Sequence, residues 1–279
     1  MLAKLHNIIS TIKHSGQKSQ TDQHTVTNAP HLMISGMHLR YKENEQNIIT
    51  DLNMYIPAAQ WTCILGRSGC GKSTLLRYLA SLLSEKVNCT GEIEISNQQP
   101  LRHQVAYMAQ QDLLMPWLSV LDNVLLSEKF DQSKSNKQNS RLQIQKAKDL
   151  LVQVGLANKA QERPQKLSGG MRQRVALART LMQDKPVVLM DEPFSALDAV
   201  TRYRLQNLAH QLLKDKTVVL ITHDPQEAIR LADQLYIMQG QPASATSLSV
   251  PDSVTPRVFD TQSATLQQLI LDKLEQDDE

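Results

Sequence analysis

The 279-residue sequence predicts an α/β fold. A short apolar run at 61–65 is followed by a glycine-rich stretch and then by apolar residues at helical spacing up to residue 83. Two further runs, 187–190 and 218–222, are short, continuously apolar and β-branched, which is typical of parallel strands buried on both faces. Together these patterns predict an open sheet whose ligands bind at the C-terminal ends of the strands.

Composition limits the class of protein. The length fits one domain with tails, and 41% hydrophobic residues suffice for a sizeable core. The 30 basic and 28 acidic residues leave a net charge of +2, which gives no support for nucleic-acid binding. The three cysteines lack metal-ligand spacing and fit a reducing compartment, and we expect Cys63 and Cys70 to be buried. No apolar stretch approaches 18 residues, so no membrane span is predicted.

Taken in order, the chain begins with a polar tail, 1–31, which we interpret as disordered. An organelle-targeting peptide is the alternative, although arginine is absent from the first 30 residues. Helical segments are predicted at 123–155, with a polar break at 131–140, and at 263–276 in a short C-terminal extension, 241–279. Strands are predicted at 32–40, 47–57, 61–65, 92–96, 105–108, 187–190, 218–222 and finally 234–238.

The glycine-rich stretch reads Gly-Arg-Ser-Gly-Cys-Gly-Lys-Ser-Thr and is closed by Gly-Lys-Ser, the pattern of a phosphate-binding P-loop. Glycines let successive N–H groups curl around an anion, and the following helix points its positive end at the same place. Lys72 can then reach the β- and γ-phosphates, and the Ser73 hydroxyl can ligate Mg²⁺. The alternative, a surface turn that matches by chance, does not explain the flanking strand and helix. The expected nucleotide-binding residues are Gly66, Arg67, Ser68, Gly69, Cys70, Gly71, Lys72, Ser73 and Thr74.

Polar side chains follow three other predicted strands. Asp191 suits the outer coordination of Mg²⁺, and Glu192 suits the base, or water positioner, for attack on the γ-phosphate. His223 and Gln110 also come directly after strands, and we expect His223 to be catalytic and Gln110 to reach metal or attacking water. Taken alone, the acidic pair could lie on a solvated loop and the histidine could be structural. Their shared place at the sheet edge favours catalysis.

A second anion-binding turn is predicted at Ser168, Gly169 and Gly170, which begin a helical pattern. Simple helix capping is the alternative. A second helix start suited to binding an anion needs a phosphate of its own, because the P-loop already binds the phosphates of one nucleotide.

The order of these motifs resembles the ATP-binding subunit of an ABC transporter, over about residues 32–240. This resemblance implies an α/β P-loop NTPase with a mixed sheet core, an antiparallel β subdomain and a helical subdomain inserted at about 112–180. Met171 departs from the family, where many members carry Gln, but we expect no loss of activity because the preceding turn makes the phosphate contacts. The matching segments are 66–73, Gln110, 167–174, 187–192, 195–198 and His223.

The resemblance also implies roles and partners. Tyr41 matches the aromatic residue that stacks on adenine, and Asp198 matches a residue that crosses a dimer interface. Ser168, Gly169 and Gly170 match the signature turn that binds the γ-phosphate of ATP held by a second copy, and His223 matches the histidine that contacts that phosphate. The implied cofactors are ATP and Mg²⁺. The implied partners are a second copy in a head-to-tail ATP dimer, membrane permease subunits and, indirectly, a substrate-binding protein, at the cytoplasmic face of a bacterial inner membrane.

Within the family, the segment 110–118 resembles importers of nitrate, sulfonate, taurine and thiamine-precursor pyrimidines. Segments 60–69 and 107–112 look most like hydroxymethylpyrimidine importers, so we expect that cargo, with a sulfonate, taurine or nitrate importer as the alternative. The apolar stretch 113–121 is expected to line the groove for a permease helix, or to be ordinary core. A non-transport ABC ATPase is a weaker alternative, because Lys72 and the signature turn are too close for a coiled-coil insertion. A monomeric P-loop kinase would leave that turn without a purpose.

Overall fold

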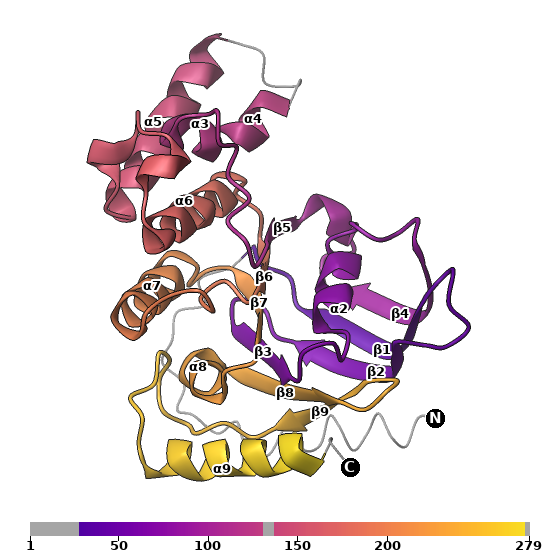
Figure 1. Cartoon of the computed structure of the whole chain (residues 1–279). Coiled ribbons are helices and arrows are strands. Elements are labelled where there is room, and N and C mark those ends of the chain that lie inside the picture. Colours follow the sequence, from indigo (N-terminus) through magenta and orange to yellow (C-terminus); the bar gives the residue numbers. More distant parts are fainter. Residues whose placement is uncertain (1–27, 131–136, 277–279) are drawn as a thin grey trace.

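The computed structural model describes residues 28–130 and 137–276, so most of the predicted polar tail lies outside the described residues. Figure 1 shows two sheets side by side, with a group of helices above them and another group against one face of the larger sheet. Every helix within these ranges is too short or too polar to cross a bilayer.

The larger sheet carries the predicted buried strands. Its first five strands in spatial order are parallel, and the sixth runs antiparallel, so the sheet is mixed as expected. All residues of the strands at 61–66, 187–191 and 217–222 are buried, because helices or the second sheet cover both faces. In spatial order the strands are β5 (Val105–Met108), β6 (Val187–Asp191), β7 (Thr217–Thr222), β3 (Trp61–Gly66), β8 (Gln234–Gln239) and β9 (Ser244–Leu248).

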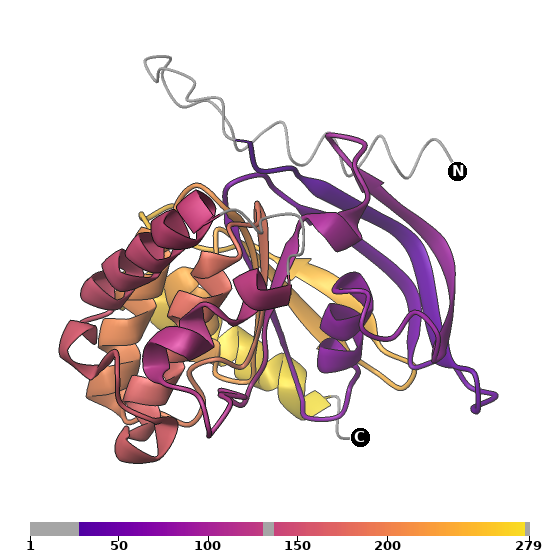
Figure 2. The ribbon, with the colours of Figure 1, turned by 90° about the horizontal axis from the view of Figure 1, so that it is seen from above.

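The smaller sheet is antiparallel, with the order β2-β1-β4, and it confirms the strands predicted near the N-terminus. It packs with α2 (Lys72–Leu79) against one face of the larger sheet, as the view from above in Figure 2 shows. Residues such as Ile64, Leu75 and Leu189 fill this layer. Its strands are β1 (Leu32–Tyr41), β2 (Ile49–Ile56) and β4 (Val87–Ile95).

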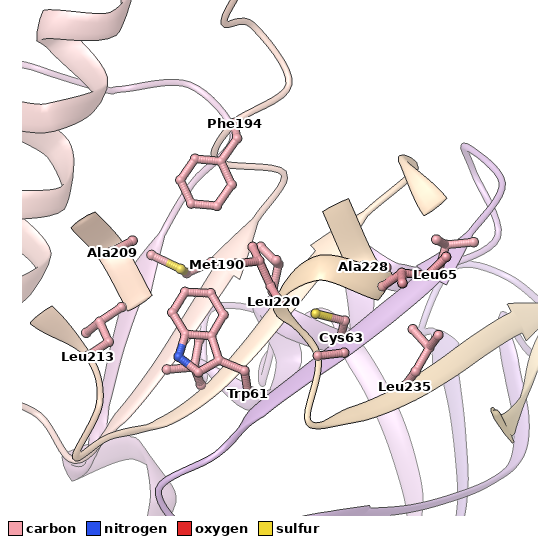
Figure 3. Close-up of a cluster of buried hydrophobic side chains, with 14 of the residues drawn as sticks. Trp61, Cys63, Leu65, Met190, Phe194, Ala209, Leu213, Leu220, Ala228 and Leu235 are labelled. Carbon is pink, nitrogen blue, oxygen red and sulfur yellow. The ribbon is translucent and has the colours of Figure 1, made fainter. Parts of the chain in front are cut away.

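Helices cover the opposite face. Because side chains alternate along a strand, Cys63 and Leu65 of β3 point to this face while Ile64 points to the other. Figure 3 shows Trp61, Cys63 and Met190 packed beneath the helices. Cys63 and Cys70 are both buried, as predicted, and burial raises the pKa of the Cys63 thiol well above its ordinary value. The covering helices are α6 (Gly169–Met182), α7 (Ala199–Leu212), α8 (Pro225–Leu231) and α9 (Thr261–Gln276).

The helical layer has its own core, formed by apolar residues such as Val120, Leu151 and Val175. The polar break predicted at 131–140 begins where α4 ends, although α5 already starts at Lys137; residues 131–136 lie outside the described residues. With α6, this layer comprises α3 (Val120–Val124), α4 (Leu126–Phe130) and α5 (Lys137–Gln153). Short 3₁₀ turns lie at Leu101–His103, Ala157–Lys159 and Pro164–Lys166.

The prediction that the strand at 234–238 is the last one is wrong. β9 follows it and pairs antiparallel with β8 at the edge of the sheet. Edge strands pair on one side only, and this one is mostly solvent-accessible, so its sequence lacks the apolar run that marks the central strands. The predicted helix at 263–276 is confirmed as α9, whose Leu266 and Ile270 enter the main core.

Candidate active site

The predicted P-loop lies between β3 and α2. Gly71 has φ 105°, and a Cβ there would stand 2.9 Å from Ile48 Cγ2, so the turn requires glycine. Lys72 is only 4% exposed, and its Nζ donates to the carbonyls of Gly66 at 2.7 Å and Arg67 at 2.5 Å. The lysine charge is therefore held over the loop, where it can exchange backbone carbonyls for phosphate oxygens.

The next contacts join the P-loop to the acidic end of β6. Ser73 Oγ donates to Asp191 Oδ1 at 2.8 Å, and the Tyr107 hydroxyl donates to Asp191 Oδ2 at 2.9 Å. Asp191 is 2% exposed, so both oxygens of a buried carboxylate are partnered. Burial raises the pKa of Tyr107 from its ordinary value of about 10 to about 12, so the hydroxyl stays protonated and able to donate well into the alkaline range. We did not predict Tyr107 as a site residue; in the structure it pairs with Leu189 of β6, two residues before Asp191, so the Tyr107 and Asp191 side chains lie on the same face of the sheet.

Ser73 and Asp191 fit a magnesium ion. A hydroxyl and a carboxylate oxygen in contact are hard ligands, and Mg²⁺ on a nucleotide needs few protein ligands because phosphates and water complete its shell. Within residues 28–130 and 137–276, no three His, Cys, Asp or Glu side chains form a separate metal cluster. Gln110, the third predicted metal ligand, contacts Glu192, and its role toward the metal stays a prediction.

Glu192 is the meeting point of the predicted catalytic side chains. Gln110 Nε2 donates to Glu192 Oε2 at 3.0 Å, and His223 Nδ1 lies 3.0 Å from the same oxygen. The Glu192 side chain is 14% exposed, whereas that of His223 is 52% exposed, so the carboxylate lies at the base of the group. Glu192 has φ 46°, a conformation that costs a non-glycine residue about 1–2 kcal/mol, and its N–H donates to the Ile221 carbonyl.

These residues form one group, which we call the strand-edge group. It consists of Lys72, Ser73, Gln110, Asp191, Glu192 and His223. Parallel β3, β5, β6 and β7 deliver all six at one edge of the sheet, as predicted. Its arrangement can hold a triphosphate, a hard cation and a base next to one another.

The signature turn, Ser168, Gly169 and Gly170, lies at the start of α6. Ser168 is the helix N-cap, and its Oγ accepts from Met171 N at 3.3 Å. Asp198 caps α7 in the same way by accepting from Thr201 N at 3.0 Å, and hydrogen bonds from the side chain and then the backbone of Thr201 lower the pKa of Asp198. Figure 1 shows both helices on the opposite side of the larger sheet from α2. The predicted capping alternative is thus part of the structure, and the phosphate-binding role stays a prediction.

Tyr41 ends β1 and packs, half-buried, against the layer between the two sheets. Its adenine-stacking role likewise stays a prediction. A hollow of about 530 Å³ lies where residues 110–113 meet the start of α6 and the turn at 195–197.

Comparisons with known proteins place this geometry in a family. The sequence model described as "ABC transporter" matches residues 49–195. An uncharacterized ABC transporter ATP-binding protein of Haemophilus influenzae is 42% identical over 235 residues, covering 83% of this chain and 94% of that protein. An aliphatic sulfonates import ATP-binding protein of Rhodococcus jostii is 37% identical, covering 90% of this chain and 96% of that protein. A solved inward-facing structure assigned to a metal-chelate type ABC transporter has a TM-score of 0.65 and 27% identity, covering 78% of this chain and 83% of that one.

Proposed function

The chain belongs to the ABC transporter family of ATP-binding proteins, and we propose that it is the ATP-hydrolysing subunit of an importer of small solutes. It is an ABC ATPase with the P-loop fold of that family. Import is supported by the sulfonate-import relatives, one of which matches this chain over nearly its whole length.

The observation that carries the proposal is the convergence of Gln110 and His223 on one oxygen of Glu192. Two contacts from different strands fix the orientation of the carboxylate next to the P-loop. Glu192 then orients water and takes its proton as the water oxygen attacks the γ-phosphorus and the bond to the β-phosphate oxygen breaks. Lys72 holds the phosphates, and Ser73 and Asp191 would hold Mg²⁺, which neutralises developing charge on the phosphate oxygens when bound.

We further propose that each ATP is completed by the signature turn of a second copy. A helix start that exposes N–H groups suits a phosphate, yet this one lies on the far side of the sheet from α2. A head-to-tail dimer resolves the separation by placing one copy's turn over the other copy's P-loop. ATP then stabilises only the closed dimer, and its hydrolysis releases the two copies.

Permease subunits are the proposed membrane partners, with a substrate-binding protein acting through them at the inner membrane. Trp117 is 68% exposed on the loop that follows residues 110–113, and Leu113, four residues earlier in the chain, is 54% exposed. Large exposed apolar side chains of this kind mark protein contact sites. We propose that they receive a cytoplasmic helix of the permease.

An aliphatic sulfonate is the cargo that the relatives favour. Hydroxymethylpyrimidine, favoured by the resemblance of segments 60–69 and 107–112, is the second candidate, because the names of the relatives give it no support. Uptake of a labelled alkanesulfonate and of labelled hydroxymethylpyrimidine in a deletion strain, restored by wild-type protein but not by Glu192→Gln, separates the two. Failure to restore either uptake contradicts both cargo assignments.

The dimer is tested directly by Glu192→Gln, which should bind ATP, hydrolyse it about 10²–10⁴-fold more slowly and accumulate as an ATP-dependent dimer. Light scattering with and without MgATP measures the mass. A variant that stays monomeric in saturating MgATP contradicts the proposal, and a P-loop kinase would behave in that way.

A further inference from the structure

Side chains of α6 donate hydrogen bonds to the backbone of the segment 110–113. Arg179 donates from Nη2 to the Asp112 carbonyl at 2.6 Å and from Nη1 to the Leu113 carbonyl at 2.8 Å. Gln173, 5% exposed, donates from Nε2 to the Gln110 carbonyl at 3.1 Å. Three of the four carbonyls in the segment therefore accept from side chains of the helix that begins at the signature turn.

A salt bridge also joins α6 to this segment. Arg172 Nε lies 2.9 Å from Asp112 Oδ2, and Arg172 Nη1 also donates to the Leu167 carbonyl, just before the signature turn. Arg172 thus connects the segment 110–113 to Leu167, the residue that precedes the signature turn. Figure 1 shows the chain leaving β5 and passing along α6 before it reaches α3.

These hydrogen bonds hold Leu113 in a backbone conformation that is unfavourable by itself. Leu113 has φ 46°, in the left-handed region that disfavours side chains, and it is 54% exposed, so core packing does not hold it there. The strong donor on its carbonyl is Arg179. Burial lowers the pKa of that guanidinium, against the opposing charge of Asp112, so its bonds to the carbonyls form in a partly desolvated place.

We propose that Arg179 is a positioning residue that acts through Gln110, fixing the segment 110–113 to α6 so that the Gln110 amide meets Glu192. This inference rests on the proposed roles of Gln110 and Glu192 in hydrolysis. It makes the signature helix and Gln110 one mechanical unit. A shift of α6 then moves the amide on Glu192 and changes the rate of hydrolysis.

Arg174 offers a matched control on the same helix. It is also half-buried, and its Nη1 donates at 3.0 Å to a backbone carbonyl, that of Val154 at the end of the helical layer. The bond has the same chemistry as those of Arg179, but its acceptor lies outside the segment 110–113. Arg174→Met therefore measures what the loss of an arginine–carbonyl bond in α6 does to the fold.

The test compares Arg179→Met, Arg179→Lys and Arg174→Met by steady-state ATPase assay, ATP titration and melting temperature. Arg179→Met should lower kcat at least tenfold while KM and the ATP dissociation constant stay within twofold. Lysine keeps the charge but supplies one donor site, so Arg179→Lys should retain an intermediate kcat, and it carries the test if the methionine variant does not fold. Equal kcat losses in Arg179→Met and Arg174→Met, or a parallel loss of ATP affinity, overturn the inference.

A double-mutant cycle separates positioning from general support. If Arg179 acts through Gln110, then Gln110→Ala with Arg179→Lys should be no more than twofold slower than Gln110→Ala alone. Independent, multiplying losses overturn the inference. A wild-type rate in Glu192→Gln would instead show that the proposed catalytic role of Glu192 is wrong, which is a different outcome from a normal rate in the Arg179 variants.

Discussion

The strand-edge group and the signature turn are predicted to handle the same phosphates, yet the two regions are held in different ways. In the first, Asp191 contacts Ser73 and the neighbouring Tyr107, and Glu192 contacts Gln110 and His223, while Lys72 bonds carbonyls of its own loop. The serine of the second caps its own helix. A single chain therefore already brings the catalytic side chains together. It holds the signature turn in a defined conformation, but the predicted phosphate ligand of that turn belongs to a second copy. Variants in the first region should act in a single copy, and variants in the second should act when two copies meet.

Lys72→Ala gives the largest expected effect and strikes the strand-edge group alone. It removes the charge that the P-loop holds with two carbonyls, and we expect ATP affinity and ATPase rate to fall by about 10²–10³-fold, the usual effect of losing one such donor. Titration with a fluorescent ATP analogue measures the affinity. Lys146→Ala, which removes a surface lysine paired with Asp184, is the charge control. Affinity within threefold of wild type would place phosphate elsewhere.

Gly170→Ala strikes the signature turn alone. A Cβ at Gly170 would stand 2.6 Å from Thr201 Cγ2, whereas one at Gly169 would meet nothing closer than 4.0 Å. We expect Gly170→Ala to lower the free energy of unfolding by about 1–3 kcal/mol through overpacking, and Gly169→Ala to leave it nearly unchanged. Urea unfolding measures both. Thr201→Ser removes the clashing methyl and should rescue Gly170→Ala; a failed rescue would mean that the cost has another origin.

Ser168→Ala sharpens the comparison through a matched cap. Ser168 and Ser119 cap α6 and α3 with nearly identical backbone angles, φ −67° in both and ψ 164° and 165°. Each alanine substitution should cost about 1 kcal/mol of stability. In a Glu192→Gln background, only Ser168→Ala should also weaken the ATP-dependent dimer, as light scattering across protein concentrations would show. If Ser119→Ala weakened the ATP-dependent dimer equally, Ser168 would act only as a helix cap and not in dimer formation.

Tyr107→Phe tests how far the preassembly of the strand-edge group matters. Loss of its hydrogen bond to Asp191 should cost about 0.5–1.5 kcal/mol, seen as a few-fold higher Mg²⁺ requirement in the ATPase assay. The folded pKa of about 12 lies above the ordinary tyrosine value, so this residue favours folding less as pH rises from about 10 to 12. Unfolding curves for Tyr107→Phe should lack that part of the alkaline loss. An unchanged Mg²⁺ requirement would show that Ser73 alone orients Asp191.

The sequence predicts the strand-edge group well because parallel strands carry their C-terminal residues to one edge whatever the loops do. It predicts β6 and β7 because both faces of these strands are buried, so their interiors are continuously apolar, while Asp191 of β6 and Thr217 and Thr222 of β7 lie at the strand ends. It misses β9, which pairs with β8 at the edge of the sheet, and it misses Tyr107 and Arg179. Tyr107 and Arg179 contact segments that are distant in the sequence, and a single sequence has no local signal for such contacts.

Trp117→Ala has the smallest expected effect on the isolated protein and a selective one in the complex. The loop that presents Trp117 is fixed, because Gln165 Nε2 donates to the Pro116 carbonyl at 3.0 Å. At 68% exposure the indole adds little to the core, so stability should change by less than about 0.5 kcal/mol and ATPase activity should persist. Transport, measured in membranes with the permease, should be lost because the substitution removes the proposed docking contact. Leu142→Ala, at a 64% exposed site on α5, is the control. Normal transport and assembly in Trp117→Ala would show that the permease does not bind this loop. The coupling of hydrolysis to transport would then depend on another surface.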